Sequence, residues 1–506
     1  MLVRRNHKAI VFLCALLALV FAIGTFLFLE RQYCMDVPLI QESDIQAYTV
    51  VSTIDISQLR MNGEKIAADV AENTVYISQP SNKLFHHSSL QGKLESVNPA
   101  HSLFFVKNAA LEDIASAVQN GTALSLLIVD DHTCQLVNVV ITTLPVIRID
   151  GAVTHQNEDG RDVLSGMVTL WAGFDPSTEV YSTTTSHLQW HVRGASSSGL
   201  PKKPFKLSLK DRDGNNADEE FLGLGADDDW ILNPMSFDDT KVREKFAMDF
   251  WNQYLSQDRA QNRMSLGEYV ELVINNEYQG LYLLQRRIDQ KYLQIDLDHD
   301  ILLKGRNTWT PSNLYEGYEI IHSPYSQEKT YQILESVLSA HDQNAIDRTE
   351  FIKTEVFLNF ISAPDNAGYK NMFYSVQQED GRFIMRFIPW DTDMSMGVTW
   401  TNGFVYDYTK SVETYITRME RNNLTQDHIA LNEMVASYWK QVRKQIYTEE
   451  NIKQLLTENI TIINNAGAYL RDMQKWGTRY DETDTHDALF AWLADRLTVL
   501  DSQYAN

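Results

Sequence analysis

The sequence predicts an α+β protein in which a strand-rich half is followed by a helix-rich half. We expect these halves to form two lobes with a cleft between them. Three observations support this. Short runs rich in β-branched and aromatic residues, split by Asn, Gly and Asp, fill the first half. Runs with apolar residues at helical spacing dominate from Ser326 onward. The 506 residues exceed one average domain, so two or three domains are expected.

The composition is that of a globular and strongly acidic protein. It is 44% hydrophobic and 11% aromatic, enough for a sizeable core, and its net charge is −23. Binding to nucleic acid through phosphate contacts requires Lys and Arg, so the charge argues against a nucleic-acid partner. The net charge does not exclude binding of a nucleotide together with a metal ion, because that binding depends on the charges at the site and not on the net charge of the protein.

The N-terminus, residues 1–34, predicts a membrane anchor. Arg4, Arg5 and Lys8 precede the uncharged apolar run Ala9–Leu29, which has the length of about 20 residues that a bilayer span needs. The basic flank stays in the cytoplasm, so the chain from about residue 35 onward is expected outside it, at the cell membrane. A cleaved signal peptide is the alternative, although no convincing small-x-small cleavage site follows the run.

Residues 35–143 are expected to form a small β-rich accessory domain. Its predicted strands are TVYISQ, SLFFV, LSLLIVD and LVNVVITTL, and no catalytic motif lies among them. Cys34 and Cys134 would both be exported, where disulfides persist. They form either a disulfide or two free thiols, because the sequence alone does not give their geometry.

Residues 144–506 are expected to form the second domain. MVTLW, LQWHVRG and KPFKLSLKD continue the strands, and DDTKVREKFAMDFWNQYL predicts a helix capped by Asp238 or Asp239. A hairpin is predicted about Asn275–Asn276, a typical tight-turn pair. Three further helices are predicted in FIKTEVFLNFISA, LNEMVASYWKQVRKQIY and ALFAWLADRLTVL.

A loop of small residues separates two of these strands, in HVRGASSSGLPKKPFKLSLKD. Gly194, three serines and Gly199 give backbone N–H groups and hydroxyls that can approach phosphate oxygens. Lys202 or Lys203 could then point inward as a phosphate clamp. The alternative is an ordinary hairpin turn, for which small residues are equally typical.

Oxygen-bearing side chains also gather around a second predicted hairpin, NMFYSVQQEDGRFIMRFIPWD. With its turn near Glu379–Gly381, Asn371 falls opposite Ile388, and Asp391 lies about three residues, or ~10 Å, further along. Asp365, Asn371 and Asp391 are therefore expected at one open end. Carboxylate and amide oxygens of this kind suit Mg²⁺ held together with substrate phosphates. The alternative for the two acids in WDTD is a strand that has reached solvent and turned.

Five stretches in this order resemble the spore-coat-protein-H-like (CotH) family of atypical protein kinases. They are RGASSSGLPKKPFKL, DDDWILNPMSFDDTKVREKFA, NEYQGLYLLQRRID, DNAGYKNMFYS and FIPWDTDMSMG, and the resemblance covers about residues 144–480. It implies a kinase-like two-lobed fold, with a strand-rich N-lobe and a helix-rich C-lobe. It also implies ATP with Mg²⁺ or Mn²⁺ as cofactors, and transfer of the γ-phosphate to Ser or Thr of a protein substrate.

The resemblance implies roles for individual residues. Asp391 would hold the metal ion, with Asn371 as a second ligand. Asp365 would accept the proton of the attacking hydroxyl, and Lys203 or its neighbour Lys202 would hold the ATP phosphates. The implied nucleotide-binding set is completed by Arg193, Ser196, Ser197 and Ser198.

Two departures from the kinase pattern bear on these roles. Asp365 and Asn371 are six positions apart, whereas the pattern has five, so strict spacing would put Asn366 in the position of the base. An amide cannot take a proton, which favours Asp365. Gln285 stands where family members commonly carry an acid. Glu244 is a candidate for the helix glutamate that pairs the lysine, although an ordinary solvated glutamate is the favoured interpretation.

Two other functions remain open at this point. The chain could be a non-catalytic cell-surface or spore-envelope scaffold with a kinase-like fold, which the scarcity of ATP outside the membrane favours. It could also be a hydrolase that uses Asp391 and Asp365 as acid and base. Only the carboxylates support the hydrolase, whereas Lys203 and Asn371 also fit phosphoryl transfer. Asp393 is expected to be structural or a secondary metal ligand.

Overall fold

The structure, a computed structural model, describes residues 33–79, 87–175, 180–256, 260–306, 317–338, 345–399, 403–404, 407–409, 428–480 and 483–504. Over these ranges the chain is a mixed α+β protein, as the sequence predicts. The predicted membrane anchor at Ala9–Leu29 lies outside the described residues. None of the helices within these ranges has the length and hydropathy that a bilayer span requires.

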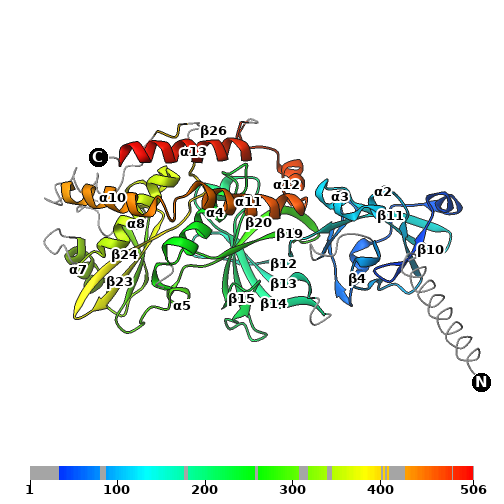
Figure 1. Ribbon diagram of the computed structural model, residues 1–506. Coiled ribbons are helices and arrows are strands. Elements are labelled where there is room, and N and C mark those ends of the chain that lie inside the picture. The colour runs from blue at the N-terminus through cyan, green and yellow to red at the C-terminus, as the bar shows by residue number, and fades with distance from the viewer. Residues whose placement is uncertain are drawn as a thin grey trace, which may run out of the picture.

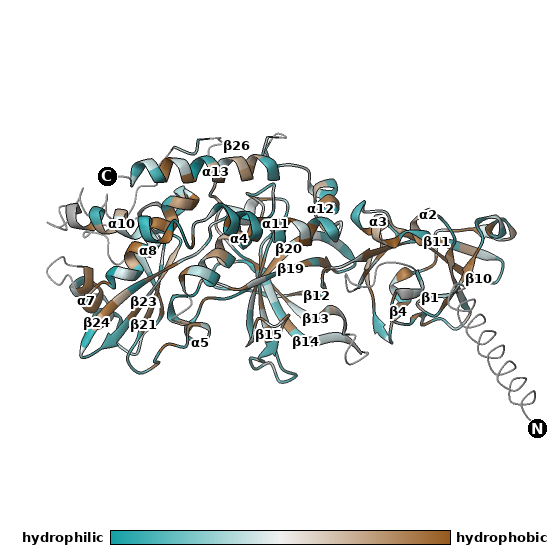
Figure 2. Cartoon of the chain, viewed as in Figure 1, coloured by the Kyte–Doolittle hydropathy of each residue, from teal (hydrophilic) through white to brown (hydrophobic). Residues whose placement is uncertain are grey.

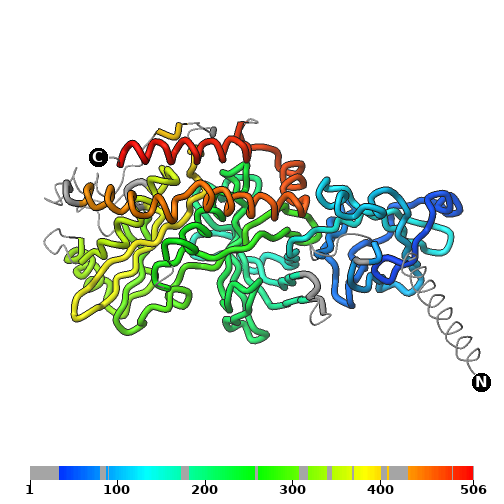
Figure 3. The backbone as a smooth tube through the Cα atoms, in the orientation of Figure 1, coloured from blue at the N-terminus to red at the C-terminus, as the bar shows by residue number. Residues whose placement is uncertain are grey.

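Residues 33–142 form a β-rich body at one end of an elongated molecule (Figure 3). Its elements are β1 (Tyr33–Cys34), β2 (Val37–Ile40), β3 (Thr49–Val50), β4 (Leu59–Met61), β5 (Glu64–Lys65), β6 (Ala67–Asp69), β7 (Thr74–Ser78), β8 (Leu94–Ser96), β9 (His101–Val106), α2 (Ala109–Glu112), α3 (Ile114–Gln119), β10 (Leu124–Asp130) and β11 (Thr133–Thr142). The main sheet has the order β1-β2-β9-β10-β11-β7-β6, with β3 on β11, and a second sheet has the order β5-β4-β8. The four predicted strand runs are confirmed as β7, β9, β10 and β11.

The two cysteines of this body are both buried and both free. Cys34 belongs to its main apolar core, and Cys134 to a smaller cluster with Val106 and Val129. Burial raises the pKa of the Cys34 thiol, so this sulfur stays protonated and unreactive. Of the two arrangements left open by the sequence, the structure has the free thiols.

Seven strands from residue 146 onward close into a barrel, which the sequence did not predict. They are β12 (Val146–Gln156), β13 (Asp162–Asp175), β14 (Val180–Val192), β15 (Phe205–Lys210), β18 (Asp229–Asn233), β19 (Gly267–Ile274) and β20 (Glu277–Arg286). The order is β12-β13-β14-β15-β18-β20-β19, and parallel pairing of β12 with β19 closes the ring. Asn275 and Asn276 connect β19 to β20 with left-handed φ of 50° and 62°, which confirms the predicted turn.

The barrel wall is tightest where two glycines face each other. Gly151 on β12 pairs with Gly166 on β13. A Cβ added to Gly166 would lie 1.9 Å from the carbonyl oxygen of Asp150, and one added to Gly151 would lie 2.5 Å from the ring of Trp190. Only glycine therefore lets these strands and the buried Trp190 approach so closely.

The first body packs directly on the barrel. Their shared apolar core includes Val146 and Val273 of the barrel. The rings of Tyr76 on β7 and Tyr278 on β20 stack with centroids 4.4 Å apart. The Asp69 carboxylate accepts the backbone N–H of Tyr278 at 3.0 Å. The β-rich body is thus joined to the barrel by burial and by polar contacts.

The remainder of the chain is a small sheet covered by helices. Its elements are β16 (Glu219–Glu220), β17 (Ala226–Asp227), α4 (Arg243–Phe250), α5 (Gln290–Leu293), β21 (Ile301–Gly305), β22 (Tyr318–His322), α7 (Gln327–Leu338), α8 (Arg348–Ile361), β23 (Met372–Glu379), β24 (Arg382–Pro389), β25 (Val398–Thr399), β26 (Gly403–Phe404), α10 (His428–Val442), α11 (Glu449–Asn465), α12 (Ala468–Trp476) and α13 (His486–Gln503). The sheet has the order β22-β21-β23-β24. The three predicted helices are confirmed as α8, α10 and α13.

The C-terminal helices run along one side of the molecule, with α13 outermost and α12 nearest the first body (Figure 1). They are mixed hydrophilic and hydrophobic along their length (Figure 2), as helices with one buried face are. Trp492 and Leu497 of α13 join α4, α8 and the sheet in the largest apolar core. This core fixes the helix-rich half against the barrel.

The helix predicted from Asp238 is shorter than expected. It begins at Arg243 and continues past Phe250 as a π-helical turn, Trp251–Leu255. Asp238 still accepts the backbone N–H of Arg243 at 2.8 Å, so it satisfies the first turn as the sequence suggests. Asp239 instead accepts two backbone N–H groups that lie near residue 480.

Candidate functional site

The hairpin β23–β24 sets the frame of the site. Asp380 and Gly381 form its turn with φ of 48° and 76°. Phe373 pairs with Ile388, so the predicted pairing of Asn371 with Ile388 is wrong by two residues. The turn is a two-residue one, tighter than the three-residue turn the prediction assumed. Asn371 consequently lies just outside the last strand pair, closer to Asp391 along the hairpin than predicted.

Asp365 reaches the same end from the preceding helix. The helix α8 ends at Ile361, and a 3₁₀ turn, Pro364–Tyr369, carries the chain to the hairpin. The Asn371 amide donates to the Asp365 carboxylate at 2.6 Å and to its backbone carbonyl at 3.3 Å. The Lys370 ammonium forms an ion pair with the other carboxylate oxygen. The structure thus brings Asp365 and Asn371 into direct contact.

Asn366 occupies a different environment from its neighbour Asp365. Its side chain is fully buried and donates to the backbone carbonyls of Asn371 and Trp390, at 2.9 and 2.8 Å. The residue that strict kinase spacing would make the base is therefore engaged with the backbone. The side chain that faces the Asn371 amide is that of Asp365.

Asp391 follows β24 with a left-handed φ of 59°. Its pKa is raised, first by burial and also by the nearby Asp365 carboxylate. The positive charges of Arg193 and Lys304 oppose this rise. Asp391 therefore sits between a second acid and two basic side chains, and not on a solvent-facing turn.

The turn after Asp391 is anchored to α4. Glu244 accepts the backbone N–H and the hydroxyl of Thr392 at 2.6 and 2.8 Å. Burial, and then the charge of Asp391, raises the pKa of Glu244 to about 7. The interpretation of Glu244 as a solvated residue is wrong, because it is 2% exposed. Its other partner is Gln285 at 3.3 Å, so it does not pair with a lysine as a kinase helix glutamate would.

Asp393 is buried beside Asp391 and Glu244. Burial, followed by these two negative charges, raises its pKa well above the usual range. Arg193 and Lys304 favour the charged form of Asp391, whereas the surroundings of Asp393 hold its carboxyl group neutral, and a neutral acid is a poor metal ligand. This supports the structural role among the two expected for Asp393.

A basic cavity of about 170 Å³ lies beside Asp391, between the barrel and the small sheet. Its walls carry four cationic side chains and one acidic one, that of Glu319, while Ile231, Phe373 and Trp390 add apolar surface. The Arg193 guanidinium lies over the Trp390 ring, 5.9 Å from its centroid. The four cationic residues are Arg193, Lys206, Arg287 and Lys304.

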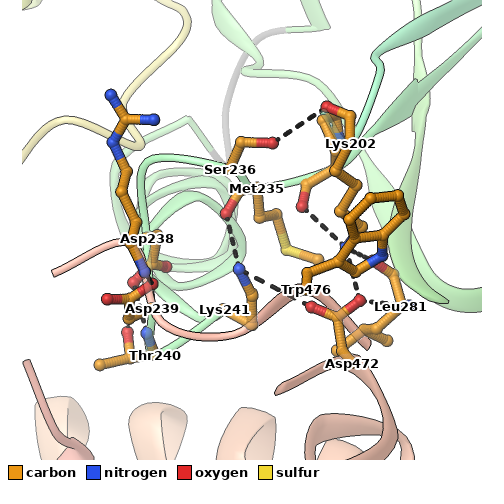
Figure 4. Close-up of polar contacts among 12 residues, drawn as sticks. Lys202, Met235, Ser236, Asp238, Asp239, Thr240, Lys241, Leu281, Asp472 and Trp476 are labelled. Carbon is orange, nitrogen blue, oxygen red and sulfur yellow. Dashed lines mark hydrogen bonds and ion pairs between the residues drawn. The ribbon is translucent and has the colours of Figure 1, made fainter. Parts of the chain in front are cut away.

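Lys202 does not line this cavity, and its ammonium points toward Asp472 (Figure 4). Its buried ammonium contacts the Asp472 carboxylate at 2.7 Å and the carbonyl oxygens of Pro234 and Leu281. Lys241 approaches the same carboxylate at 3.8 Å. Burial lowers the pKa of Lys202 to about 8. The expected contact of Lys202 with phosphates is therefore replaced by an internal ion pair.

Lys203 and Ser198 form hydrogen bonds within their own loop. The Lys203 ammonium donates to the Ser198 carbonyl at 2.9 Å, and the Ser198 hydroxyl donates to the Ala195 carbonyl at 2.7 Å. Ser197 begins a short 3₁₀ turn that follows Ser196. These contacts match the alternative of an ordinary turn. Of the predicted nucleotide-binding set, Arg193 is the member that lines the basic cavity.

Sequence reasoning missed Lys206, Arg287 and Lys304. Lys206 stands among alternating apolar residues in FKLSLK, and Lys304 ends the apolar run ILLK. Both patterns are typical of a β-strand. The face that Lys206 occupies depends on closure of the barrel, and the face that Lys304 occupies depends on the pairing of β21 in the four-stranded sheet; neither arrangement was predicted. Lys206 and Arg287 both contact the Asp229 carboxylate, which holds them at the cavity.

A separate acidic cluster lies away from the hairpin. One carboxylate oxygen each of Asp218, Asp227 and Asp228 fall within 4.8 Å of one another. The Lys291 ammonium contacts Asp218 at 2.7 Å and Asp228 at 2.9 Å. This lysine neutralises part of the charge, so the cluster is accounted for as an ion-pair network.

Comparison with known proteins gives one match. The family model described as CotH kinase protein matches residues 190–500, which include the hairpin, the basic cavity and all C-terminal helices up to α13. No curated protein matches the chain.

Proposed function

The chain belongs to the CotH kinase protein family, and from this premise we propose that it transfers the γ-phosphate of ATP to Ser or Thr of a protein substrate. The observation that carries the proposal is the contact of Asp365 with Asn371 beside Asp391. A base, an amide and a second acid around one hairpin end are what phosphoryl transfer with a divalent metal requires.

The oxygen donors present fit a hard divalent cation such as Mg²⁺ or Mn²⁺. Asp391 and Asn371 would hold it, and Asp391 is a partly buried carboxylate whose negative charge is favoured by the nearby Arg193 and Lys304. The metal would neutralise charge on the transferring phosphoryl group. The donor chemistry is therefore compatible with the cofactor that the family implies.

The chain's own residues supply the remaining steps. The basic cavity would bind the nucleotide phosphates, with Arg193 and Lys304 closest to the acids. Asp365 would orient the acceptor hydroxyl and take its proton, while Asn371 holds the Asp365 carboxylate by the 2.6 Å hydrogen bond. Lys370, paired with Asp365, would have to shift so that the hydroxyl can approach.

We also propose that this domain works outside the cytoplasm, tethered to the cell membrane by Ala9–Leu29. The support is the uncharged run itself and its basic flank at Arg4, Arg5 and Lys8. The partners proposed are the membrane, through this segment, and an exported protein substrate, with no role for nucleic acid.

The test is phosphorylation by the purified chain with γ-labelled ATP, Mn²⁺ or Mg²⁺, and casein as acceptor. Asp391→Ala should abolish metal-dependent nucleotide binding. Asp365→Ala should spare that binding and lower turnover about 10²–10⁴-fold, because a base acts only in the chemical step. Asp393→Asn is the matched control, since an isosteric amide replaces a carboxyl that burial keeps neutral. Equal and small effects of all three would contradict the proposal.

A non-catalytic scaffold is the second candidate, and one observation favours it. The Lys370 ammonium covers the Asp365 carboxylate, as it would in a site that does no chemistry. If the wild-type chain binds neither Mn²⁺ nor ATP at millimolar concentrations, the scaffold is the better account.

A further inference from the structure

Asn366 links the two chain segments that carry the proposed metal ligands. Its side-chain nitrogen donates to the carbonyl oxygen of Asn371 at 2.9 Å and to that of Trp390 at 2.8 Å. The Trp390 carbonyl belongs to the peptide unit that leads into Asp391. One planar amide thus contacts both the peptide unit after Asn371 and the peptide unit before Asp391.

The orientation of this amide is fixed by its surroundings. Exchanging its nitrogen and oxygen would place the oxygen against two carbonyl oxygens, which cannot donate a hydrogen bond. The Asn366 oxygen is buried and finds no hydrogen-bond partner among the described residues. A buried oxygen without a hydrogen-bond partner destabilises the folded state, so an apolar residue would be better at a position that is only filled. The two donated hydrogen bonds are what the amide provides.

Those bonds act beside two residues with a left-handed backbone. Asn371 and Asp391 have φ of 52° and 59°, a region that residues with a side chain adopt uncommonly and that Asn and Asp tolerate best. Such conformations persist only where the surrounding structure imposes them. The side-chain amide of Asn366 hydrogen-bonds a peptide unit next to each of these two residues. The backbone N–H of Asn366 in turn donates to the Ala363 carbonyl at 3.1 Å.

We propose that Asn366 is a positioning residue that sets the separation and direction of the Asn371 and Asp391 side chains for a divalent cation. The inference rests on the proposed function of the site. It also explains why an amide occupies the position where strict kinase spacing would place the base. The Asn366 side chain hydrogen-bonds the backbone at both ends of the hairpin, and the carboxylate of the neighbouring Asp365 faces the site.

The test compares Asn366→Asp with a matched control, Asn359→Asp. Asn359 on α8 is also a buried amide that donates to a backbone carbonyl, that of Glu355 at 3.1 Å, and its oxygen is also unpartnered among the described residues. Both substitutions replace a buried amide by an isosteric carboxyl and should lower thermal stability similarly. Only Asn366→Asp removes donors from the proposed ligand segments.

The readout is the dissociation constant for Mn²⁺, measured on the full chain by electron paramagnetic resonance with ADP present. Asn366→Asp should weaken Mn²⁺ binding about 10–100-fold, as loss of a residue that orients metal ligands does. Asn359→Asp should leave it unchanged. Excess Mn²⁺ should restore phosphorylation in Asn366→Asp, because the base Asp365 is intact. If Asn366→Asp does not fold, the same measurement is made on Asn366→Ser. Serine has one donor in place of two, so this variant should also bind Mn²⁺ more weakly than wild type.

Three results separate the two ideas. Wild-type chain that binds no Mn²⁺ with ADP removes the proposed function and this inference with it. Wild-type binding with unchanged affinity in Asn366→Asp overturns the inference alone. Higher activity in Asn366→Asp, without weaker Mn²⁺ binding, would show that position 366 is the place of the base.

Discussion

Replacing Asp472 by Asn should destabilise the protein in a way that depends on pH. The Asp472 carboxylate contacts the buried Lys202 ammonium at 2.7 Å, and it also accepts the backbone N–H of Leu281 at 2.9 Å. Asparagine keeps the acceptor for Leu281 and removes only the charge. The ammonium of Lys202 then loses its counter-ion and is expected to release its proton.

The pKa of Lys202 limits how much unfolding free energy the Asp472→Asn substitution can remove. Burial lowers it to about 8, so at pH 7 the protonated form is favoured by one pH unit, or about 1 kcal/mol. The substitution cannot cost more than this through Lys202, because the neutral amine is the fallback. The limit rises to about 3 kcal/mol at pH 6 and falls to nearly zero at pH 9. Loss of the longer contact with Lys241, at 3.8 Å, adds to the cost of the substitution.

Urea unfolding at pH 6, 7, 8 and 9, followed by tryptophan fluorescence, measures the difference between wild type and Asp472→Asn. The control is the same substitution in a Lys202→Met background, where the difference should no longer vary with pH. A difference in the parent background that is flat from pH 6 to 9 would refute the reasoning. Lys202→Met should also bind Mn²⁺–ATP as wild type does, since Lys202 is not placed at the basic cavity.

The sign for Lys202 itself follows from its lowered pKa. A lysine whose pKa is lower in the folded state contributes its stability fully above the unfolded value near 10.5, and loses it as the pH falls through about 8. Wild type should therefore gain stability relative to Lys202→Met between pH 8 and 10.

Three further outcomes are expected. Arg471→Met should cost about 3–5 kcal/mol in urea unfolding, because it leaves the buried Glu271 carboxylate without its counter-ion, and adding Glu271→Met should recover only part of that loss, since the Tyr278 hydroxyl then loses its acceptor. Gly166→Ala should prevent folding of the barrel, seen as loss of soluble protein, since its Cβ would lie 1.9 Å from the Asp150 carbonyl oxygen. If Ala9–Leu29 is an uncleaved anchor, the chain should sediment with membranes after a high-salt wash and be digested by protease added outside intact cells; release as a soluble product beginning beyond this segment would show a cleaved signal instead.

Local signals in the sequence predicted most of the elements that frame the site. Asn275–Asn276 and Asp380–Gly381 are turn pairs whose conformations belong to the residues themselves, so both hairpins could be foreseen. The register of the second was misjudged by two residues, and the assumption of a three-residue turn accounts for one of them. One residue of difference in a turn shifts every cross-strand pair, which moved Asn371 toward Asp391.

The placement of charged side chains depended on contacts that no local pattern carries. Lys202 and Lys203 are adjacent and chemically identical, yet one pairs with Asp472, which is 270 positions away in the sequence, and the other with its own loop. Glu244 stands on a helix of mixed polarity, and its burial follows from Thr392, 148 positions later. Closure of the barrel by parallel pairing of β12 with β19 is likewise a long-range event without a sequence signal.

The ion pair between Lys202 and Asp472 also has a consequence for the time course of synthesis. A ribosome that has completed all barrel strands, through Arg286, has not yet made the counter-ion for the lysine buried among them. Until helix α12 arrives, the barrel either stays open at this point or holds Lys202 as a neutral amine, which its lowered pKa permits. Chains that stop before Ala468 should therefore have a less stable barrel, which reaches its full stability only after the last helices have been made.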